Sequence, residues 1–279
     1  GLMGLNITFG SQGDLAPACN ISLDALCDGR GYNNYNMEVV DRMGADSFCP
    51  DSGVMISKTK NSDRRQPFQW VIDANPQDAR VIDFYLPNGT ARYWSIGDYR
   101  QLVDALFHAG TNSGSEFEHV DEANGLHLYV LDKHRDASGV LRYTVGARST
   151  RRSASPATHD VKLRQGVVSG NSSSEGLYCT FQLDNTGKPA SNTTAAHHPQ
   201  DLSAYLGSDI FRLDAKVEGK GWEVGVPNAL TYAKFGASTQ VKVAVRSAYG
   251  AADKATVKLT VTSESDATVK AQKSCKVSV

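Results

Sequence analysis

The feature that most constrains the fold of this chain is the alternation of apolar and polar residues at every second position. The pattern is clear in MEVVDRM from Met37, in GLHLYVLDKH from Gly125, and in STQVKVAVRS and KATVKLTVTSES from Ser238 onward. A two-residue period puts successive side chains on opposite faces of a β-strand, so that one face packs on the core and the other meets solvent. The sequence therefore predicts an all-β fold.

One segment follows a helical period instead. In IGDYRQLVDALFHAG, which begins at Ile96, Asp98 can cap a helix and Gly110 can end it. Four apolar side chains between these two residues would form a single face: Tyr99, Leu102, Val103 and Leu106. The sequence predicts one α-helix at residues 96–109, packed on the surface of a β domain.

A polar segment near the middle of the chain, STRRSASPA, indicates a connection between domains. It starts at Ser149, contains two adjacent arginines and ends beside a proline. Such segments are typical of exposed linkers and of sites for proteolytic processing. We therefore expect two β-sandwich domains: residues 1–155, which include the inserted helix, and residues 156–279.

The second domain shows the strand spacing of an immunoglobulin-like sandwich. About seven alternating segments are expected there, and turns such as DNTGK, VEGKGW and SAYGAAD separate them. Trp222, in GKGWEV, is expected to pack in the core between the two sheets.

Charge and hydropathy exclude several classes of partner. The chain has 29 basic and 30 acidic residues, and no segment gathers the basic ones. A nucleic acid or an anionic membrane surface is therefore not an expected partner. The longest apolar runs fall far short of the roughly 20 residues that a membrane-spanning helix needs.

Cysteines and glycan acceptors together indicate secretion. No two of the five cysteines form a C-x-x-C pair, and none stands at zinc-site spacing from a histidine. Disulfide bonds are typical of oxidising compartments, and Asn-x-Ser/Thr acceptors are used only in the secretory pathway. Five such acceptors predict a secreted glycoprotein: Asn6, Asn20, Asn88, Asn171 and Asn192.

Two disulfide bonds are expected. Cys19 and Cys27 bracket a short loop, and Cys179 and Cys275 lie on the first and last well-patterned strands of the second half. Cys49 then has no local partner. It is either a buried free thiol, or bonded to Cys19 or Cys27 in a different pairing, or bonded to a segment outside this chain.

No catalytic or metal-binding motif is visible in the sequence. H-E-x-x-H, G-x-S-x-G and D-x-D-x-D-G are all absent. His119 and His127 flank a predicted hairpin, and we interpret them as cross-strand surface histidines. His197 and His198 are adjacent, so their side chains would point apart on an extended chain. Carboxylates on predicted strands are interpreted as solvent-facing: Asp73, Asp83, Glu116 and Glu118.

Long segments of the chain resemble a known family. NNYNMEVVDRMGADSFCPDSGVMISKTK and YRQLVDALFHAGTNSGSEFEHVDEANGLHLYVLDKHRD are similar to the region downstream of the catalytic domain in secreted immune inhibitor A-type (M6-like) metallopeptidases. The second half, with CTFQLDNTGK and SAYLGSDIFRLDAKVEGKGWEVGVPNAL, resembles the immunoglobulin-like domain found behind α-galactosidases and other secreted hydrolases.

The resemblance implies a non-catalytic accessory region of a secreted zinc endopeptidase. The zinc-binding H-E-x-x-H would lie upstream, so no cofactor is expected in this chain and zinc is expected in the missing catalytic domain. The implied partners are that upstream portion of the same precursor and the protein substrates of the parent enzyme.

A different class of function is a glycan- or cell-wall-binding module, for which the second domain would have to expose aromatic rings. Most of its aromatic residues occupy core-phase positions or lie beside glycines: Tyr178, Tyr205, Phe211, Trp222, Tyr232, Phe235 and Tyr249.

Overall fold

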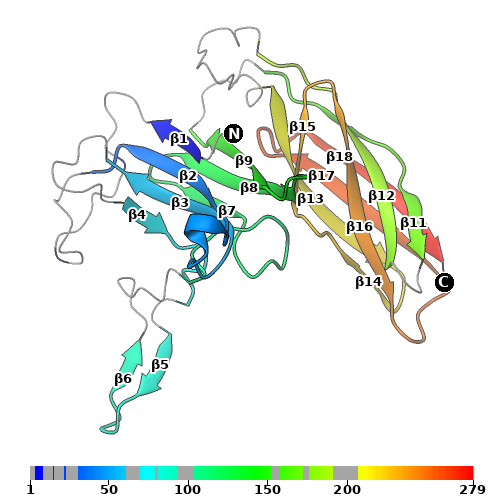
Figure 1. Ribbon diagram of the computed structural model, residues 1–279. Coiled ribbons are helices and arrows are strands. Elements are labelled where there is room, and N and C mark those ends of the chain that lie inside the picture. Colours follow the sequence, from blue (N-terminus) through cyan, green and yellow to red (C-terminus); the bar gives the residue numbers. More distant parts are fainter. Residues whose placement is uncertain are drawn as a thin grey trace. The chain divides into compact units, whose positions relative to one another are not determined.

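The computed structural model describes the following residues: 4–8, 15, 22, 31–60, 69–78, 81–93, 103–151, 157–171, 176–190 and 207–278. Across these ranges the regular structure is antiparallel β-sheet with one short 3-10 turn at Gly44–Asp46, and no α-helix is present in them (Figure 1). The predicted all-β fold is confirmed. The chain divides into two compact units, residues 1–151 and 152–279, each with its own core.

The first unit contains two sheets and a separate hairpin. One sheet has four strands in sequence order: β1 (Gly4–Thr8), β2 (Asn34–Val40), β3 (Gly53–Thr59) and β4 (Gln69–Ile72). The other has three: β7 (Glu118–Asp121), β8 (Leu126–Arg135) and β9 (Leu141–Ser149). Alternate apolar residues of both sheets form one core, in which Tyr35 and Ile56 of the first sheet join Leu128 and Val130 of the second.

The hairpin consists of β5 (Ile82–Tyr85) and β6 (Ala91–Tyr93), which pair with each other and with no other described strand. Every residue of β5 is exposed. A two-stranded hairpin on its own is at best marginally stable in water, so its exposed apolar side chains need an explanation.

The predicted helix is wrong in the part that the structure describes, residues 103–109. Phe107 forms an isolated antiparallel bridge with Val54, through two backbone hydrogen bonds of 2.9 Å. The two residues before Phe107 are buried as well, and three consecutive buried side chains do not fit one face of a surface helix. Packing of Phe107 in the core thus overrides the local helical period. Residues 96–102 lie outside the described residues.

The second unit is a sandwich of two antiparallel sheets. The first sheet holds β10 (Val161–Leu163), β11 (Val167–Asn171), β12 (Gly176–Asn185), β14 (Trp222–Gly225) and β16 (Ser238–Ser247). The second holds β13 (Ser208–Glu218), β15 (Leu230–Lys234), β17 (Lys254–Ser263) and β18 (Lys270–Ser278). Burial alternates strictly along β17, as the two-residue period predicts.

A disulfide bond joins the two sheets of this sandwich. Cys179 on β12 is bonded to Cys275 on β18, with 6.1 Å between their Cα atoms, and both residues are fully buried. The predicted pair is therefore present. Trp222 lies in the same core, and its indole Nε1 donates to the Ala252 carbonyl at 2.7 Å. Cys19 and Cys27 lie outside the described residues, so their pairing stays a prediction.

Candidate functional site

The first unit has a polar cluster between its two sheets, which we call the Asp121 cluster: Tyr35, Lys58, Asp121 and Asn124. Lys58 Nζ lies 3.4 Å from Asp121 Oδ2, and Asn124 Nδ2 donates to the same oxygen at 2.7 Å. The Tyr35 hydroxyl donates to Asp121 as well, and Lys58 Nζ lies 5.2 Å from the centre of the Tyr35 ring. All four residues are buried.

Electrostatics follow from this burial. Burial, together with the hydrogen bond to Asp121, raises the pKa of Tyr35 far above its ordinary value. For Asp121 burial opposes ionisation, but the bonds from Tyr35 and Asn124 and the charge of Lys58 outweigh it and lower its pKa. Asp121 is therefore an ionised carboxylate, and three neighbouring residues from both sheets stabilise its negative charge.

His119 and His127 lie on paired strands, as predicted, but the expectation of a surface residue is wrong for His127, and His119 is half-buried. His127 is buried, and its two ring nitrogens lie 2.8 Å from Glu118 Oε2 and 2.8 Å from the Tyr129 hydroxyl. His119 lies on the opposite face of the hairpin, between the Tyr35 and Phe107 rings. Burial lowers the pKa of His119.

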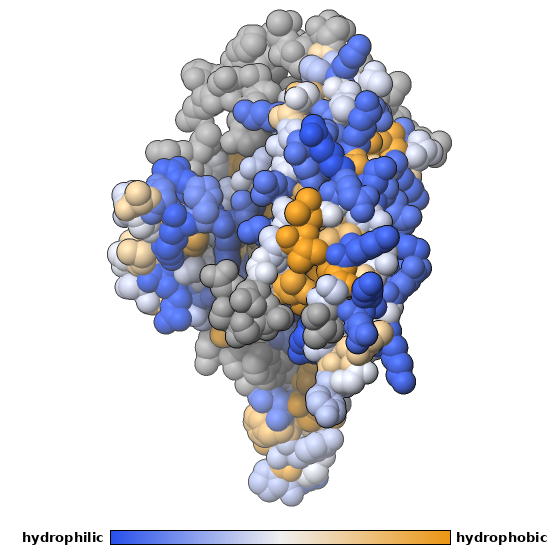
Figure 2. Space-filling view, turned by 90° about the vertical axis from the view of Figure 1, so that its right-hand side faces the viewer, coloured by the Kyte–Doolittle hydropathy of each residue, from blue (hydrophilic) through white to orange (hydrophobic). Residues whose placement is uncertain are grey.

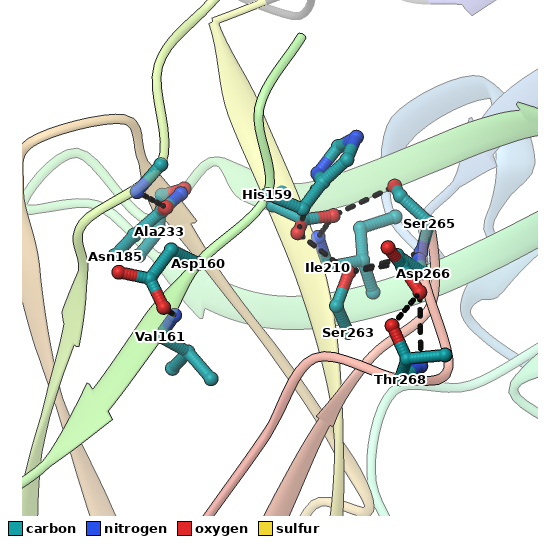
Figure 3. Close-up of polar contacts among 12 residues, drawn as sticks. His159, Asp160, Val161, Asn185, Ile210, Ala233, Ser263, Ser265, Asp266 and Thr268 are labelled. Atoms are coloured by element: carbon teal, nitrogen blue, oxygen red, sulfur yellow. Dashed lines mark hydrogen bonds and ion pairs between the residues drawn. The ribbon is translucent and has the colours of Figure 1, made fainter. Parts of the chain in front are cut away.

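The second unit has a comparable group, the Asp209 cluster: His159, Asp209, Ser263 and Ser265. Asp209 accepts hydrogen bonds from Ser263 Oγ at 2.7 Å and from Ser265 Oγ at 2.8 Å. His159 Nδ1 lies 3.0 Å from Asp209 Oδ2, and the Asp209 side chain is fully buried. Figure 3 shows His159 beside Ser263 and Ser265, which belong to one segment: Ser263 is the last residue of β17 and Ser265 follows two positions later.

The Asp209 cluster contains the residue types of a nucleophilic triad without its connectivity. In such a triad the serine hydroxyl donates to the histidine, which in turn donates to the aspartate. Here both serine hydroxyls donate to Asp209, and His159 Nε2 is buried with no hydrogen-bond partner among the described residues. This geometry ties segments of the sandwich together and does not activate a hydroxyl group.

Metal binding receives no support from the described residues, which contain no group of three His, Cys, Asp or Glu side chains placed to hold an ion. Of the four carboxylates interpreted as solvent-facing, Asp83 and Glu116 are exposed. Asp73 and Glu118 are half-buried, and burial raises the pKa of Asp73. His197 and His198 lie outside the described residues.

A turn between β2 and β3, residues 41–52, presents apolar groups at the surface. We call it the anchored turn, because a fork of hydrogen bonds holds its first residue: Arg135 Nη1 and Nη2 each donate to an Asp41 carboxylate oxygen at 2.7 Å. These bonds lower the pKa of Asp41. Near the other end of the turn, His108 Nε2 lies 2.7 Å from Asp51 Oδ2.

The tip of the anchored turn exposes Phe48, with 83% of its surface accessible, and Met43 with 59%. Cys49 is half-buried next to Phe48 and is not disulfide-bonded within the described part of the chain. Exposed apolar side chains on a fixed backbone are typical of a binding surface. This turn is the candidate functional site of the first unit.

Sequence reasoning missed most of these groups, although a signal existed for some. Asp209 stands in phase with Phe211 and Leu213 on β13, so the alternation already placed a carboxylate on the core face. Phe48, an aromatic residue in the turn sequence GADSFCPDSG, was visible as an apolar residue where turns are usually polar. The fork between Arg135 and Asp41 joins residues 94 positions apart and has no local signature.

The predicted glycan acceptors fall in different settings. Asn6 lies within strand β1, Asn171 is the last residue of β11, and Asn88 lies in the turn of the β5–β6 hairpin. Asn20 and Asn192 are outside the described residues.

Two family models match the chain. One, described as a middle domain, matches residues 1–150, and the other, described as a peptidase M6-like domain, matches residues 162–279. A protein of Arthroderma benhamiae, named as a candidate secreted metallopeptidase, is 50% identical over 280 residues. That match covers 99% of this chain and 40% of the relative, so the chain spans less than half of the relative's length.

The fold and these matches first define a class: the chain is a secreted all-β protein related to metallopeptidases. The chain belongs to the family of this middle domain, whose model alone matches more than half of its residues. The predicted secreted localisation is confirmed by the relative. No helix in the described ranges has the length and apolar character needed to cross a membrane.

Proposed function

We propose that this chain is the non-catalytic accessory region of a larger secreted zinc endopeptidase of the immune inhibitor A type. One observation carries the proposal: the metallopeptidase relative matches the whole chain but extends far beyond it, while the chain itself contains no H-E-x-x-H. The catalytic zinc and its ligands would then belong to the remaining part of the parent protein. The peptidase M6-like description of the second matched model supports this type of parent.

Within this proposal the second unit is immunoglobulin-like. Its two antiparallel sheets, the disulfide between them and the buried Trp222 all support that class. The role of both units is to support the catalytic portion or to present substrate to it. The polar linker that starts near Arg151, an exposed residue, is a proposed site of proteolytic nicking between the two units.

The anchored turn is the proposed contact with the catalytic portion, and Cys49 is the proposed covalent link to it. Phe48 and Met43 supply apolar surface, and the paired ends of the turn limit the entropy lost on binding. In an oxidising medium an accessible thiol exchanges or oxidises, so a disulfide partner for Cys49 is expected. Bonds to Cys19 or Cys27, or a buried free thiol, are the competing arrangements.

The tether is tested on full-length parent that has been cut between the catalytic portion and this chain, because a cut at the linker near Arg151 would leave Cys49 and the catalytic portion on one polypeptide. A gel without reductant should show one joined species, which reductant separates into two, and Cys49→Ser should give the separated species without reductant. Ser47→Ala, in the same turn, is the matched control and should leave the joined species intact. A free, alkylatable Cys49 in the unreduced parent would contradict the tether.

Binding through the apolar tip is tested separately, by co-purification of the two processed pieces in the Cys49→Ser background. Phe48→Ser should weaken the association, because it removes the largest exposed apolar group of the turn. Unchanged association would rule out the turn as the contact while leaving the accessory role of the chain in place.

Glycan or cell-wall binding by the second unit is the weaker candidate function. Phe211 and Trp222 are buried, so neither can form a sugar-binding platform. Tyr249, fully exposed after β16, is the one large aromatic side chain that is exposed in the described part of this unit. Tyr249→Ala should abolish retention on insoluble polysaccharide if this function exists.

A further inference from the structure

The β5–β6 hairpin exposes more large apolar side chains than any other element among the described residues: Ile82, Phe84, Tyr85 and Tyr93, with Val81 exposed directly before β5. Its two strands pair with each other and with no other described strand. The hairpin is at the bottom of Figure 1, and Figure 2 shows hydrophobic atoms at the same lower end of the molecule. Surfaces of this kind are normally covered.

The turn of this hairpin has a defined geometry. The Gly89 N–H donates to the Leu86 carbonyl at 2.8 Å, and the Leu86 N–H donates to the Thr90 carbonyl at 2.9 Å. Gly89 has a φ of 81°, a left-handed conformation that glycine adopts without strain. This is a three-residue loop with a left-handed residue at its last position, one of the common hairpin connections.

Asn88 stands at the tip of this loop, in the acceptor sequence Asn88-Gly89-Thr90. Its Oδ1 accepts a hydrogen bond from the Thr90 N–H at 3.0 Å, which fixes the amide plane. The amide nitrogen Nδ2, the atom that carries an N-linked glycan, has no partner among the described residues, and Asn88 is exposed. Asn6, by contrast, lies within a paired strand.

We propose that Asn88 carries an N-linked glycan, and that this glycan covers the apolar surface at the end of the β5–β6 hairpin. Leu86 and Thr90 are paired across the turn, and Phe84 and Arg92 form the next pair on the same face. The first sugar of a glycan on Asn88 therefore lies over Leu86 and Thr90, with Phe84 behind them. The apolar face of the sugar ring packs on these side chains, and its hydroxyl groups face solvent.

The modification takes place during passage through the secretory pathway and needs a lipid-pyrophosphate-linked oligosaccharide as donor. Asn88 Nδ2 loses a proton and forms a bond to C1 of the first N-acetylglucosamine. The bond between C1 and the pyrophosphate oxygen breaks, and the lipid pyrophosphate leaves with the electron pair. No oxidant or reductant is involved.

Occupancy is tested with the full chain secreted from a eukaryotic host. Peptide mapping should find a hexosamine-bearing peptide that contains Asn88. Asn88→Gln should lower the apparent mass of the chain on a gel by the mass of one glycan. Thr90→Ala should have the same effect because it destroys the acceptor, whereas Thr90→Ser should retain the glycan. An unmodified peptide at this position in the secreted chain would overturn the proposal.

The covering role is tested on the same material after trimming to a single N-acetylglucosamine. Compared with this form, Asn88→Gln should show faster amide hydrogen exchange at Leu86 and stronger self-association by sedimentation. Phe84→Ser in the Asn88→Gln background should restore the monomer, because the uncovered apolar surface is then smaller. A glycan on Asn88 whose removal changes neither exchange nor association would overturn this role and leave the hairpin as a docking surface for another protein.

Discussion

Asp121 accepts hydrogen bonds from Tyr35 and Asn124 and faces the ammonium group of Lys58, so a single carboxylate joins the two sheets of the first unit. Asp121→Ala would remove the counter-charge of a buried lysine and the acceptor of a buried hydroxyl. We expect it to lower the free energy of unfolding of the first unit by about 3–5 kcal/mol. Urea denaturation measures this change.

The matched control is Asp132→Ala, at an exposed position on strand β8 of the same unit. It should change the unfolding free energy by less than about 0.5 kcal/mol. Equal effects of the two substitutions would show that the Asp121 cluster does not stabilise the unit.

His119 gives the first unit a pH dependence of defined sign. Burial lowers its pKa below the ordinary value of 6.5, so the unfolded chain binds the proton more readily than the folded one. Above pH 6.5 His119 is neutral in the folded and in the unfolded state, so its ionisation does not affect stability. As the pH falls below 6.5, the unfolded chain binds the proton first, and the free energy of unfolding decreases until the pH reaches the lower pKa of the folded state.

His119→Gln removes this proton linkage. Between about pH 7 and pH 5 its unfolding free energy should fall less steeply than that of the unmodified chain, as measured by urea denaturation at each pH. The control substitution is His134→Gln, at an exposed histidine of the same unit. A steeper slope for His119→Gln would contradict the assignment.

At the scale of elements, the bond between Cys179 and Cys275 fixes β12 to β18 across 96 residues of sequence. In the chain-entropy account, closing a loop of this length stabilises the folded unit by about 4–5 kcal/mol. The double variant Cys179→Ala, Cys275→Ala should lose stability of this order in urea. If reductant lowers the urea midpoint of the double variant as much as that of the unmodified chain, the loss does not come from this bond.

The part of the fold that the sequence predicts is the set of strands in which buried and exposed positions alternate regularly. On β17 the sequence KATVKLTVTS alternates in the same phase as its burial, so strand and buried face follow from the letters alone. The helix prediction for the segment that ends at Phe107 was wrong because Phe107 pairs with Val54, 53 positions away, and local sequence does not show that contact.

Polar clusters were unpredictable for a related reason. Tyr35 and Asp121 are 86 residues apart, and Asp209 and Ser265 are 56 apart. Each residue alone is an ordinary polar residue on a strand or turn. Only the pairing of strands brings them together, whereas Cys179 and Cys275 could be matched because cysteine has one dominant partner in a secreted protein.

At the scale of the whole molecule, the proposal that the catalytic zinc is bound outside this chain predicts how the chain alone behaves toward zinc. The chain alone should bind no stoichiometric zinc after dialysis, and it should cleave no protein substrate, because the proposed ligand set belongs to the other part of the parent. Elemental analysis and a casein assay check both points. Full-length parent, carried through the same dialysis, is the positive control. One tightly held zinc ion per chain, or chelator-sensitive cleavage by the chain, would contradict the proposal.

The bond between Cys179 and Cys275 also decides what happens when the backbone is cut. The two cysteines lie on the first long strand and on the last strand of the second unit, so most peptide bonds of that unit fall between them. A single nick anywhere in that interval leaves both fragments covalently joined by the disulfide bond. In a medium that contains active peptidases, a damaged copy of this unit therefore stays whole until it is reduced.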